Sequence, residues 1–177
     1  MAATGSDRGG RPDAERGRDV AALVEALRRR ERWAIAQAAT ELEIMGPRAQ
    51  RLLAGLGGEL GRATVVGITG PPGAGKSTLV NALILALRAG NRSVGVIAVD
   101  PSSPYSNGAI LGDRIRMTAA ADDDAVFVRS LAAQGTLGGL TPAAVRIIDA
   151  LDGAGFDTII LETVGTGQNE IDVAEIA

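Results

Sequence analysis

The segment GPPGAGKS, residues 70–77, has the residue types and spacing that suit phosphate binding. It fits G-x-x-x-x-G-K-[ST], in which glycines let the backbone curl so that successive N–H groups point at phosphate oxygens. Lys76 would then reach the β- and γ-phosphates, the Ser77 hydroxyl would bind Mg²⁺, and Thr78 could donate to the α-phosphate. The predicted nucleotide-binding residues are Gly70, Pro71, Pro72, Gly73, Ala74, Gly75, Lys76, Ser77 and Thr78.

The flanking residues favour this interpretation over a chance match in a chain with 24 glycines. ATVVGIT, residues 63–69, is a short apolar run rich in β-branched residues, which is typical of a buried strand. Residues 77–88 are predicted to form a helix, whose N-terminus adds partial positive charge beside a bound phosphate. A phosphate loop requires this strand–loop–helix context.

Acidic residues follow two further apolar runs. Asp100 comes directly after the predicted strand 93–99, and Glu162 closes the predicted strand 157–162. Because an open parallel sheet binds ligands beyond the carboxyl ends of its strands, both acids are expected near the phosphate loop, as Mg²⁺ ligands or water-positioning groups. The alternatives are a helix cap or Asx-turn for Asp100 and an ordinary strand-end acid for Glu162.

Two other segments carry a less specific signal. Asp113 in LGD is equally compatible with a metal ligand and with the N-cap of a helix near 113–121. In TVGTGQN, residues 163–169, Gly165 and Gly167 could let a loop turn backbone N–H groups onto a γ-phosphate and relax when that phosphate leaves. A simple tight turn is the alternative.

The composition excludes several classes of catalytic and metal-binding chemistry. The chain has no Cys and no His, which excludes disulfides, thiol catalysis and the commonest transition-metal ligand. A metal must therefore be held by oxygen, and Mg²⁺ suits that best. A net charge of −3 and only 2% aromatic residues argue against a nucleic-acid partner. With no apolar run long enough for a membrane span and no signal peptide, a cytoplasmic location is expected, and abundant Ala, Gly and Arg fit a bacterium.

The chain is predicted to have three parts: a disordered polar leader at 1–18, a helical extension at 19–60, and the N-terminal part of a phosphate-loop (P-loop) domain at 61–177. Beyond residue 60, apolar runs of strand length alternate with helical patterns. This alternation predicts an α/β fold, a mostly parallel sheet flanked by helices on both faces. Further predicted helices are 20–27, 33–44, 47–56 and 142–154, and a further strand is 125–129.

Together the motifs resemble one family. GITGPPGAGKST (67–78), VIAVDPSSPYSNGAILGDRIRM (96–117), GTLGG (135–139) and AGFDTIILETVGTGQNE (154–170) resemble the GTPases that assist cobalamin-dependent acyl-CoA mutases, the MeaB/ArgK/MMAA type within the SIMIBI class of P-loop GTPases. The resemblance covers roughly residues 60–177 and implies GTP or GDP as ligand with Mg²⁺ as cofactor. It implies a metal and water shell of Ser77, Asp100, Asp113 and Glu162, with Gly165 beside the nucleotide. Lys76 would act on the phosphates, and Glu162 is favoured over Gln168 for orienting the attacking water.

The resemblance also implies partners. The mutase, for example methylmalonyl-CoA mutase, would be the main one, its adenosyltransferase a second, and the full-length parent would be a homodimer. GTP hydrolysis would gate cofactor loading and protection of the mutase. The family reads guanine with an N-K-x-D segment that this sequence does not contain before Ala177, so the chain resembles a C-terminally truncated one. The last strand of such a shortened sheet is expected to be an exposed edge.

Two other classes of function stay open. An ATP-dependent small-molecule kinase or a transport-associated ATPase would use the same loop. A non-catalytic interaction module would bind a partner through residues 20–60 and use the nucleotide only to set its shape.

Overall fold

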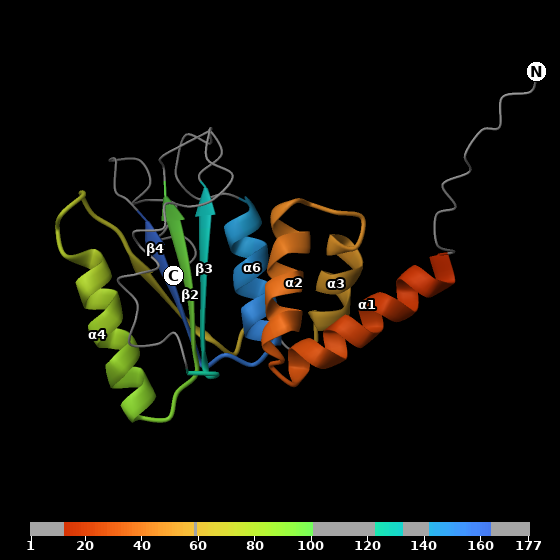
Figure 1. Cartoon of the computed structure of the whole chain (residues 1–177), viewed down its shortest axis with the longest axis horizontal. Helices are drawn as coiled ribbons and strands as arrows, with labels where there is room; N and C mark the ends of the chain where they lie inside the picture. The colour runs from red at the N-terminus through yellow and green to blue at the C-terminus, as the bar shows by residue number, and fades with distance from the viewer. Residues whose placement is uncertain (1–12, 59, 101–122, 133–141, 164–177) are drawn as a thin grey trace, which may run out of the picture.

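The computed structural model describes residues 13–58, 60–100, 123–132 and 142–163. Strands alternate with helices after an all-helical start, and the strands form one parallel sheet, as predicted (Figure 1). The helices are α1 (Asp13–Arg28), α2 (Arg32–Glu43), α3 (Ala49–Leu56), α4 (Lys76–Ala89) and α6 (Pro142–Gly153). The strands are β1 (Thr64–Ile68), β2 (Val94–Asp100), β3 (Val126–Ala132) and β4 (Thr158–Thr163).

The strand order is β1-β4-β2-β3, so the last described strand lies inside the sheet. The predicted exposed edge at β4 is therefore wrong. β4 pairs in parallel with β1 on one side and with β2 on the other, and all six of its residues are buried. The edges among the described strands are β1 and β3. The position between β1 and β2 is filled by β4, which the chain forms last among the described strands.

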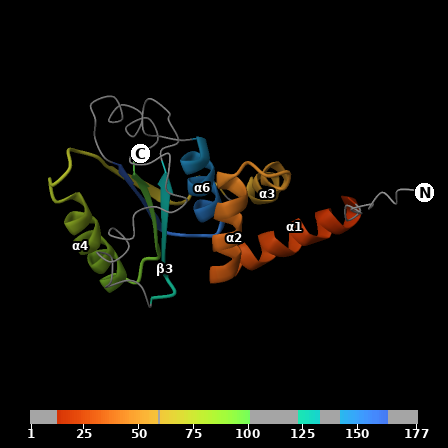
Figure 2. The same ribbon diagram turned by 45° about the horizontal axis from the view of Figure 1, so that its top comes forward.

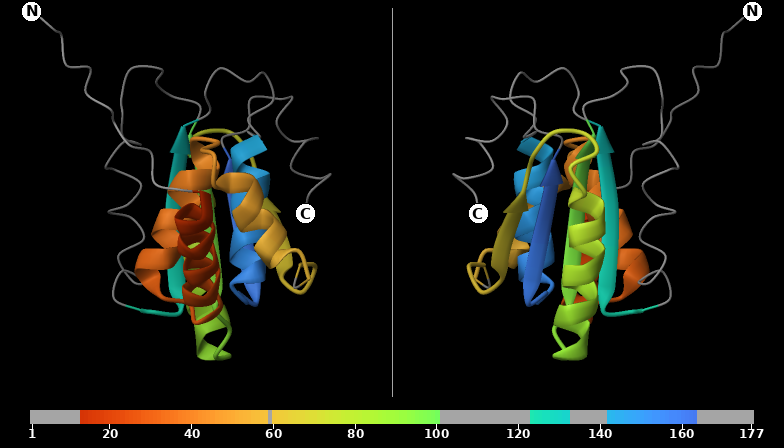
Figure 3. Two further views of the ribbon diagram at one scale, coloured as in Figure 1. Left: turned by 90° about the vertical axis from the view of Figure 1, so that its right-hand side faces the viewer. Right: turned by 90° about the vertical axis from the view of Figure 1, so that its left-hand side faces the viewer.

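The two faces of the sheet are covered unequally. One face carries α6, and α6 in turn packs against the helical extension α1–α3, whereas α4 is the only helix among the described residues that covers the other face (Figures 2 and 3). The first face forms a large apolar core that runs without interruption from α1 to the sheet, through Leu27, Leu56, Leu151 and Ile159. The second core is small and centres on Val80 and Ile84 of α4.

The helical extension is part of the main core. In α1, Val20, Leu23, Val24 and Leu27 recur at i, i+3, i+4 and i+7 and are buried, as their spacing predicts. Helix α1 begins at Asp13, so the prediction of a disordered leader is wrong for residues 13–18, while residues 1–12 lie outside the described part.

Close backbone approaches fix α6 between the sheet and the extension. A Cβ built on Gly95 of β2 would lie 2.8 Å from Leu151 Cδ1, and one on Gly153 would lie 3.0 Å from Leu56 Cβ. The Asp152 carboxylate, which is buried, accepts the backbone N–H groups of Gly61, Arg62 and Ala63. It thereby ties the segment that enters β1 to the end of α6.

Strand β3 continues three residues past its predicted end at Arg129. Arg129 forms an ion pair with Glu43 at the end of α2, which compensates its charge inside the fold. Leu131, two residues further on, is buried in the main core. At the opposite end of the sheet, Arg88 of α4 donates to Asp123, and this bond lowers the pKa of Asp123.

Candidate nucleotide-binding site

The predicted phosphate loop connects β1 to α4 at the carboxyl end of the strands. Gly73 and Gly75 have φ angles of 79° and 86°, a left-handed conformation that side chains with a Cβ rarely adopt. Gly75 is the N-cap residue of α4, and its carbonyl accepts the Leu79 N–H at 2.9 Å. Residues 71–75 are exposed, and Gly70 is half-buried. The loop is thus curled, accessible and continuous with a helix N-terminus, as phosphate binding requires.

Lys76 opens α4 and folds back over the loop. Its Nζ donates to the Pro71 carbonyl at 3.0 Å, which holds the ammonium above the loop backbone. Lys76 and Ser77 are half-buried, and Thr78 is exposed. The loop, the ammonium and the helix end all present positive charge or donors to one location.

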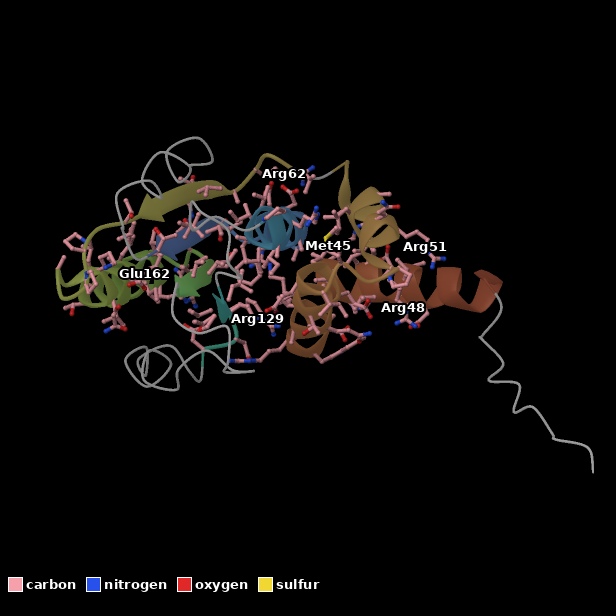
Figure 4. All side chains as sticks on the ribbon, turned by 90° about the horizontal axis from the view of Figure 1, so that it is seen from above. Met45, Arg48, Arg51, Arg62, Arg129 and Glu162 are labelled. Atoms are coloured by element: carbon pink, nitrogen blue, oxygen red, sulfur yellow. The ribbon has the colours of Figure 1, made fainter. Side chains whose placement is uncertain are left out.

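Ser77 and Glu162 meet across the sheet edge. The Ser77 hydroxyl donates to Glu162 Oε1 at 2.8 Å, and the Glu162 side chain is only 6% exposed. In register, Glu162 pairs with Ile68 of β1 and Ala98 of β2, so the central strand delivers it to the loop. Figure 4 shows Glu162 beside α4, in contrast to Arg129, which lies toward α2. Two residues 85 positions apart, both singled out from the sequence, are thereby in contact.

The other predicted acids are only partly placed. Asp100 is the last residue of β2 and pairs with Ala132, two positions beyond Ala98. Its backbone therefore reaches the same edge as Glu162. Asp113, Gly165 and Gln168, and the predicted helix 113–121, lie outside the described residues.

The described residues fit a hard divalent cation that shares its shell with phosphate. Ser77 and Glu162 supply a hydroxyl and a carboxylate oxygen, the donor types that Mg²⁺ prefers. Within the described ranges, no group of three or more His, Cys, Asp or Glu residues forms a metal cage. This donor set matches Mg²⁺, which commonly binds through one or two protein groups together with substrate phosphates and water.

Sequence reasoning missed two polar groups at this edge. The hydroxyls of Thr69 and Thr163 follow the apolar parts of β1 and β4, are buried, and have no hydrogen-bond partner in the described structure. Buried hydroxyls normally have a partner. Their only sequence signal is a Thr directly after an apolar strand.

Helices long and apolar enough to cross a membrane do not occur in the described part of the chain.

Comparison with known proteins agrees with this geometry. Residues 35–177 match the family model of the methylmalonyl Co-A mutase-associated GTPase MeaB. The GTPase ArgK of Escherichia coli is 42% identical over 161 residues, which are 89% of this chain and 49% of that protein. The methylmalonic aciduria type A homolog, a mitochondrial protein of Mus musculus, is 43% identical over 111 residues, or 63% of this chain and 27% of that protein.

A crystal structure of an LAO/AO transport system kinase superposes with a TM-score of 0.68 at 35% identity, covering 88% of this chain and 46% of that one. This chain thus spans about half the length of the relatives it matches along most of its own length. The family match covers the phosphate loop, Glu162 and most of the helical extension. This chain belongs to the methylmalonyl-CoA mutase-associated GTPase family.

Proposed function

We propose that this chain is the nucleotide-binding part of a Mg²⁺-dependent GTPase that assists a cobalamin-dependent acyl-CoA mutase. The observation that carries the proposal is the 2.8 Å hydrogen bond between Ser77 and Glu162, which joins the phosphate loop to the end of the central strand. Two oxygen donors beside a curled loop and a helix N-terminus suit a nucleoside triphosphate with its metal. The GTPase names of the relatives support guanine as the base.

The proposed mechanism assigns tasks to the phosphate loop, to Lys76 and to the oxygen donors around the metal. The backbone N–H groups of the loop bind phosphate oxygens, and Lys76 Nζ exchanges the Pro71 carbonyl for the β- and γ-phosphates. Ser77 and Glu162 would hold Mg²⁺, with Asp100 and Asp113 completing its shell. When bound, Mg²⁺ neutralises charge on the β- and γ-phosphates. Glu162, or Gln168 in second place, orients the water that attacks the γ-phosphate, and a Gly165 N–H contacts that phosphate.

The partners follow from the family. The name of the family model refers to methylmalonyl Co-A mutase and that of the mouse relative to methylmalonic aciduria, which supports a mutase such as methylmalonyl-CoA mutase as partner. Nucleotide state would gate loading of the cobalamin cofactor and protection of the mutase. The adenosyltransferase that serves the mutase, a homodimeric parent and a bacterial cytoplasmic location belong to the same proposal.

A competition titration tests nucleotide binding. Labelled GTP with Mg²⁺ is displaced by unlabelled GTP, GDP or ATP, on the wild type, on Lys76→Ala and on Leu85→Ala, an exposed position of the same helix. We expect GTP and GDP to compete, ATP to compete poorly, Lys76→Ala to lose binding and Leu85→Ala to keep it. Binding that survives Lys76→Ala would contradict the proposed site.

Hydrolysis is tested separately with Glu162→Gln, which keeps the size and one oxygen of the side chain. Losing the carboxylate that orients water should lower turnover by about a hundredfold and change GTP affinity much less. Unchanged turnover would remove Glu162 from its proposed role.

One observation favours a second function. The LAO/AO transport system kinase is a kinase by name, and its fold matches this chain. An ATP-dependent kinase would prefer ATP in the titration and would transfer phosphate to a substrate, whereas the GTPase releases phosphate into solution.

A further inference from the structure

Two threonines follow the ends of neighbouring strands, on the side of the sheet that α6 covers. Ile68 of β1 aligns with Glu162 of β4, which is adjacent in the sheet. Thr69 and Thr163 are the next residues along the chain after this pair. Successive side chains of a strand point to opposite faces of the sheet. Because Glu162 bonds to Ser77 of α4, Thr163 points to the opposite face, which α6 covers.

The preceding residues of both strands support this orientation. Leu161, two positions before Thr163, is buried in the main core on the α6 side. Val65, four positions before Thr69, packs against the same core. Since adjacent strands are about 5 Å apart, the two threonine side chains are near neighbours across β1 and β4.

Both threonine hydroxyls are buried, and neither has a hydrogen-bond partner in the described structure. Thr163 is only 1% exposed, and the residue that aligns with it on β2 is the buried Val99. A buried hydroxyl without a partner destabilises a fold, whereas a valine of similar shape would suit these apolar surroundings. Two such hydroxyls at neighbouring positions therefore indicate a partner that they share.

We propose that one buried water molecule bridges the hydroxyls of Thr69 and Thr163, and that the two threonines are positioning residues for the candidate nucleotide site. The hydroxyls do not bond to each other. Two hydrogen bonds of about 2.8 Å through one water span roughly 4.5–5.5 Å, which matches the spacing of adjacent strands. Buried waters typically bond to polar groups that have no partner within the protein.

The bridge would hold the phosphate loop from the side opposite to Ser77. Thr69 directly precedes Gly70, the first residue of the loop, and Thr163 directly follows Glu162. On the α4 side, the bond between Ser77 and Glu162 joins the start of α4 to the end of β4. With the bridge, both ends of the loop are tied to the end of β4, which fixes Glu162 relative to a bound phosphate. This positioning role rests on the proposed GTPase function, whereas the bridge itself does not.

Melting temperatures measured without nucleotide test the bridge. Thr69→Val and Thr163→Val each remove one hydroxyl with little change in volume, and the double variant removes both. Loss of a bridging bond should lower the melting temperature of each single variant by about 2–4 °C. The double variant should melt no lower than the single ones, because the second substitution removes a bond that is already broken. Single variants that melt at or above the wild-type temperature, or shifts that add in the double variant, would overturn the bridge.

Steady-state GTP hydrolysis tests the positioning role. Thr163→Val should lower kcat by roughly tenfold and leave the KM for GTP nearly unchanged, because the hydroxyl acts on the placement of Glu162. Thr163→Ser keeps the hydroxyl and should restore kcat. The matched control is Thr158→Val, the same change at the buried start of the same strand, which should leave kcat unchanged.

The outcomes of the two measurements are distinguishable. A wild-type kcat in Thr163→Val, or an equal loss of kcat in Thr158→Val, would overturn the positioning role. If the wild type hydrolyses no GTP, the proposed function fails, whereas the melting temperatures still decide whether the bridge exists.

Discussion

The two faces of the sheet differ in the size of their apolar core and in their relation to the candidate nucleotide site. On one face, α6 and the helical extension form a continuous apolar core with close contacts at Gly95 and Gly153. On the other face, α4 covers a small core and leaves Leu79 and Leu85 exposed, yet it carries the phosphate loop and Ser77. Among the described residues, most of the buried apolar side chains lie on the face away from α4, whereas the candidate site lies beside α4. Substitutions on the two faces should therefore separate stability from nucleotide binding.

The largest expected effect on the free energy of unfolding is on the face of the sheet that α6 and the helical extension cover. Leu56 of α3 is fully buried against α6, so Leu56→Ala should lower the free energy of unfolding by about 2–5 kcal/mol, through lost burial and a cavity. Urea denaturation measures this change in the free energy of unfolding. Leu85→Ala on α4 is the control and should cost little, because Leu85 is half exposed. Similar costs for the two would show that the faces do not differ in packing.

Gly95→Ala tests the closest approach on the same face. The new Cβ would lie 2.8 Å from Leu151 Cδ1, and Leu151 is buried and has little room to move, so the free energy of unfolding should fall by roughly 1–3 kcal/mol. Adding Leu151→Ala to Gly95→Ala makes room for the methyl group, and a double-mutant cycle then measures the coupling. Additive costs would mean that the two residues do not clash.

On the face that α4 covers, Ser77→Ala should separate nucleotide binding from stability. It removes the hydroxyl that bonds to Glu162, so Mg²⁺-dependent GTP affinity should fall by about 10–100-fold while the melting temperature changes little. Ser77→Thr keeps the hydroxyl and should restore most of the affinity. A melting temperature that falls as much as it does in Gly95→Ala would assign the Ser77–Glu162 bond a mainly structural role.

The smallest expected effects concern two acids with opposite shifts. Burial, with the nearby Asp152 carboxylate, raises the pKa of Asp149, so its charge destabilises the fold at neutral pH and this penalty disappears as the pH falls through the raised value. Hydrogen bonds from Ser93 lower the pKa of Asp157, so its contribution is present above the unfolded value and is lost as the pH falls through the lowered one. Thermal melts at pH 7 should show a slight gain for Asp149→Asn and a slight loss for Asp157→Asn.

Local patterns predicted much of this molecule. The phosphate loop, the helices and strands near it, and the approach of Glu162 follow from glycine spacing, apolar runs and the rule that parallel strands end together. The position of β4 could not be predicted, because strand order depends on which long-range pairing buries the most apolar surface. Asp152 is a comparable case, since its role depends on backbone N–H groups about 90 positions away. The length of β3 was missed for the same reason, because Glu43 compensates Arg129 from a distant helix.

The central position of β4 has a consequence for synthesis on the ribosome. Among the described strands, β1 pairs only with β4, whose first residue, Thr158, aligns with Thr64. At about 5–20 residues per second, β1 waits roughly 5–20 seconds after its own synthesis for this partner. During that interval the phosphate loop is attached to an unpaired apolar strand. The nascent chain therefore exposes the phosphate loop before β4 and Glu162 have been synthesised to complete the candidate site. A chaperone that shields residues 63–69 would act during this interval.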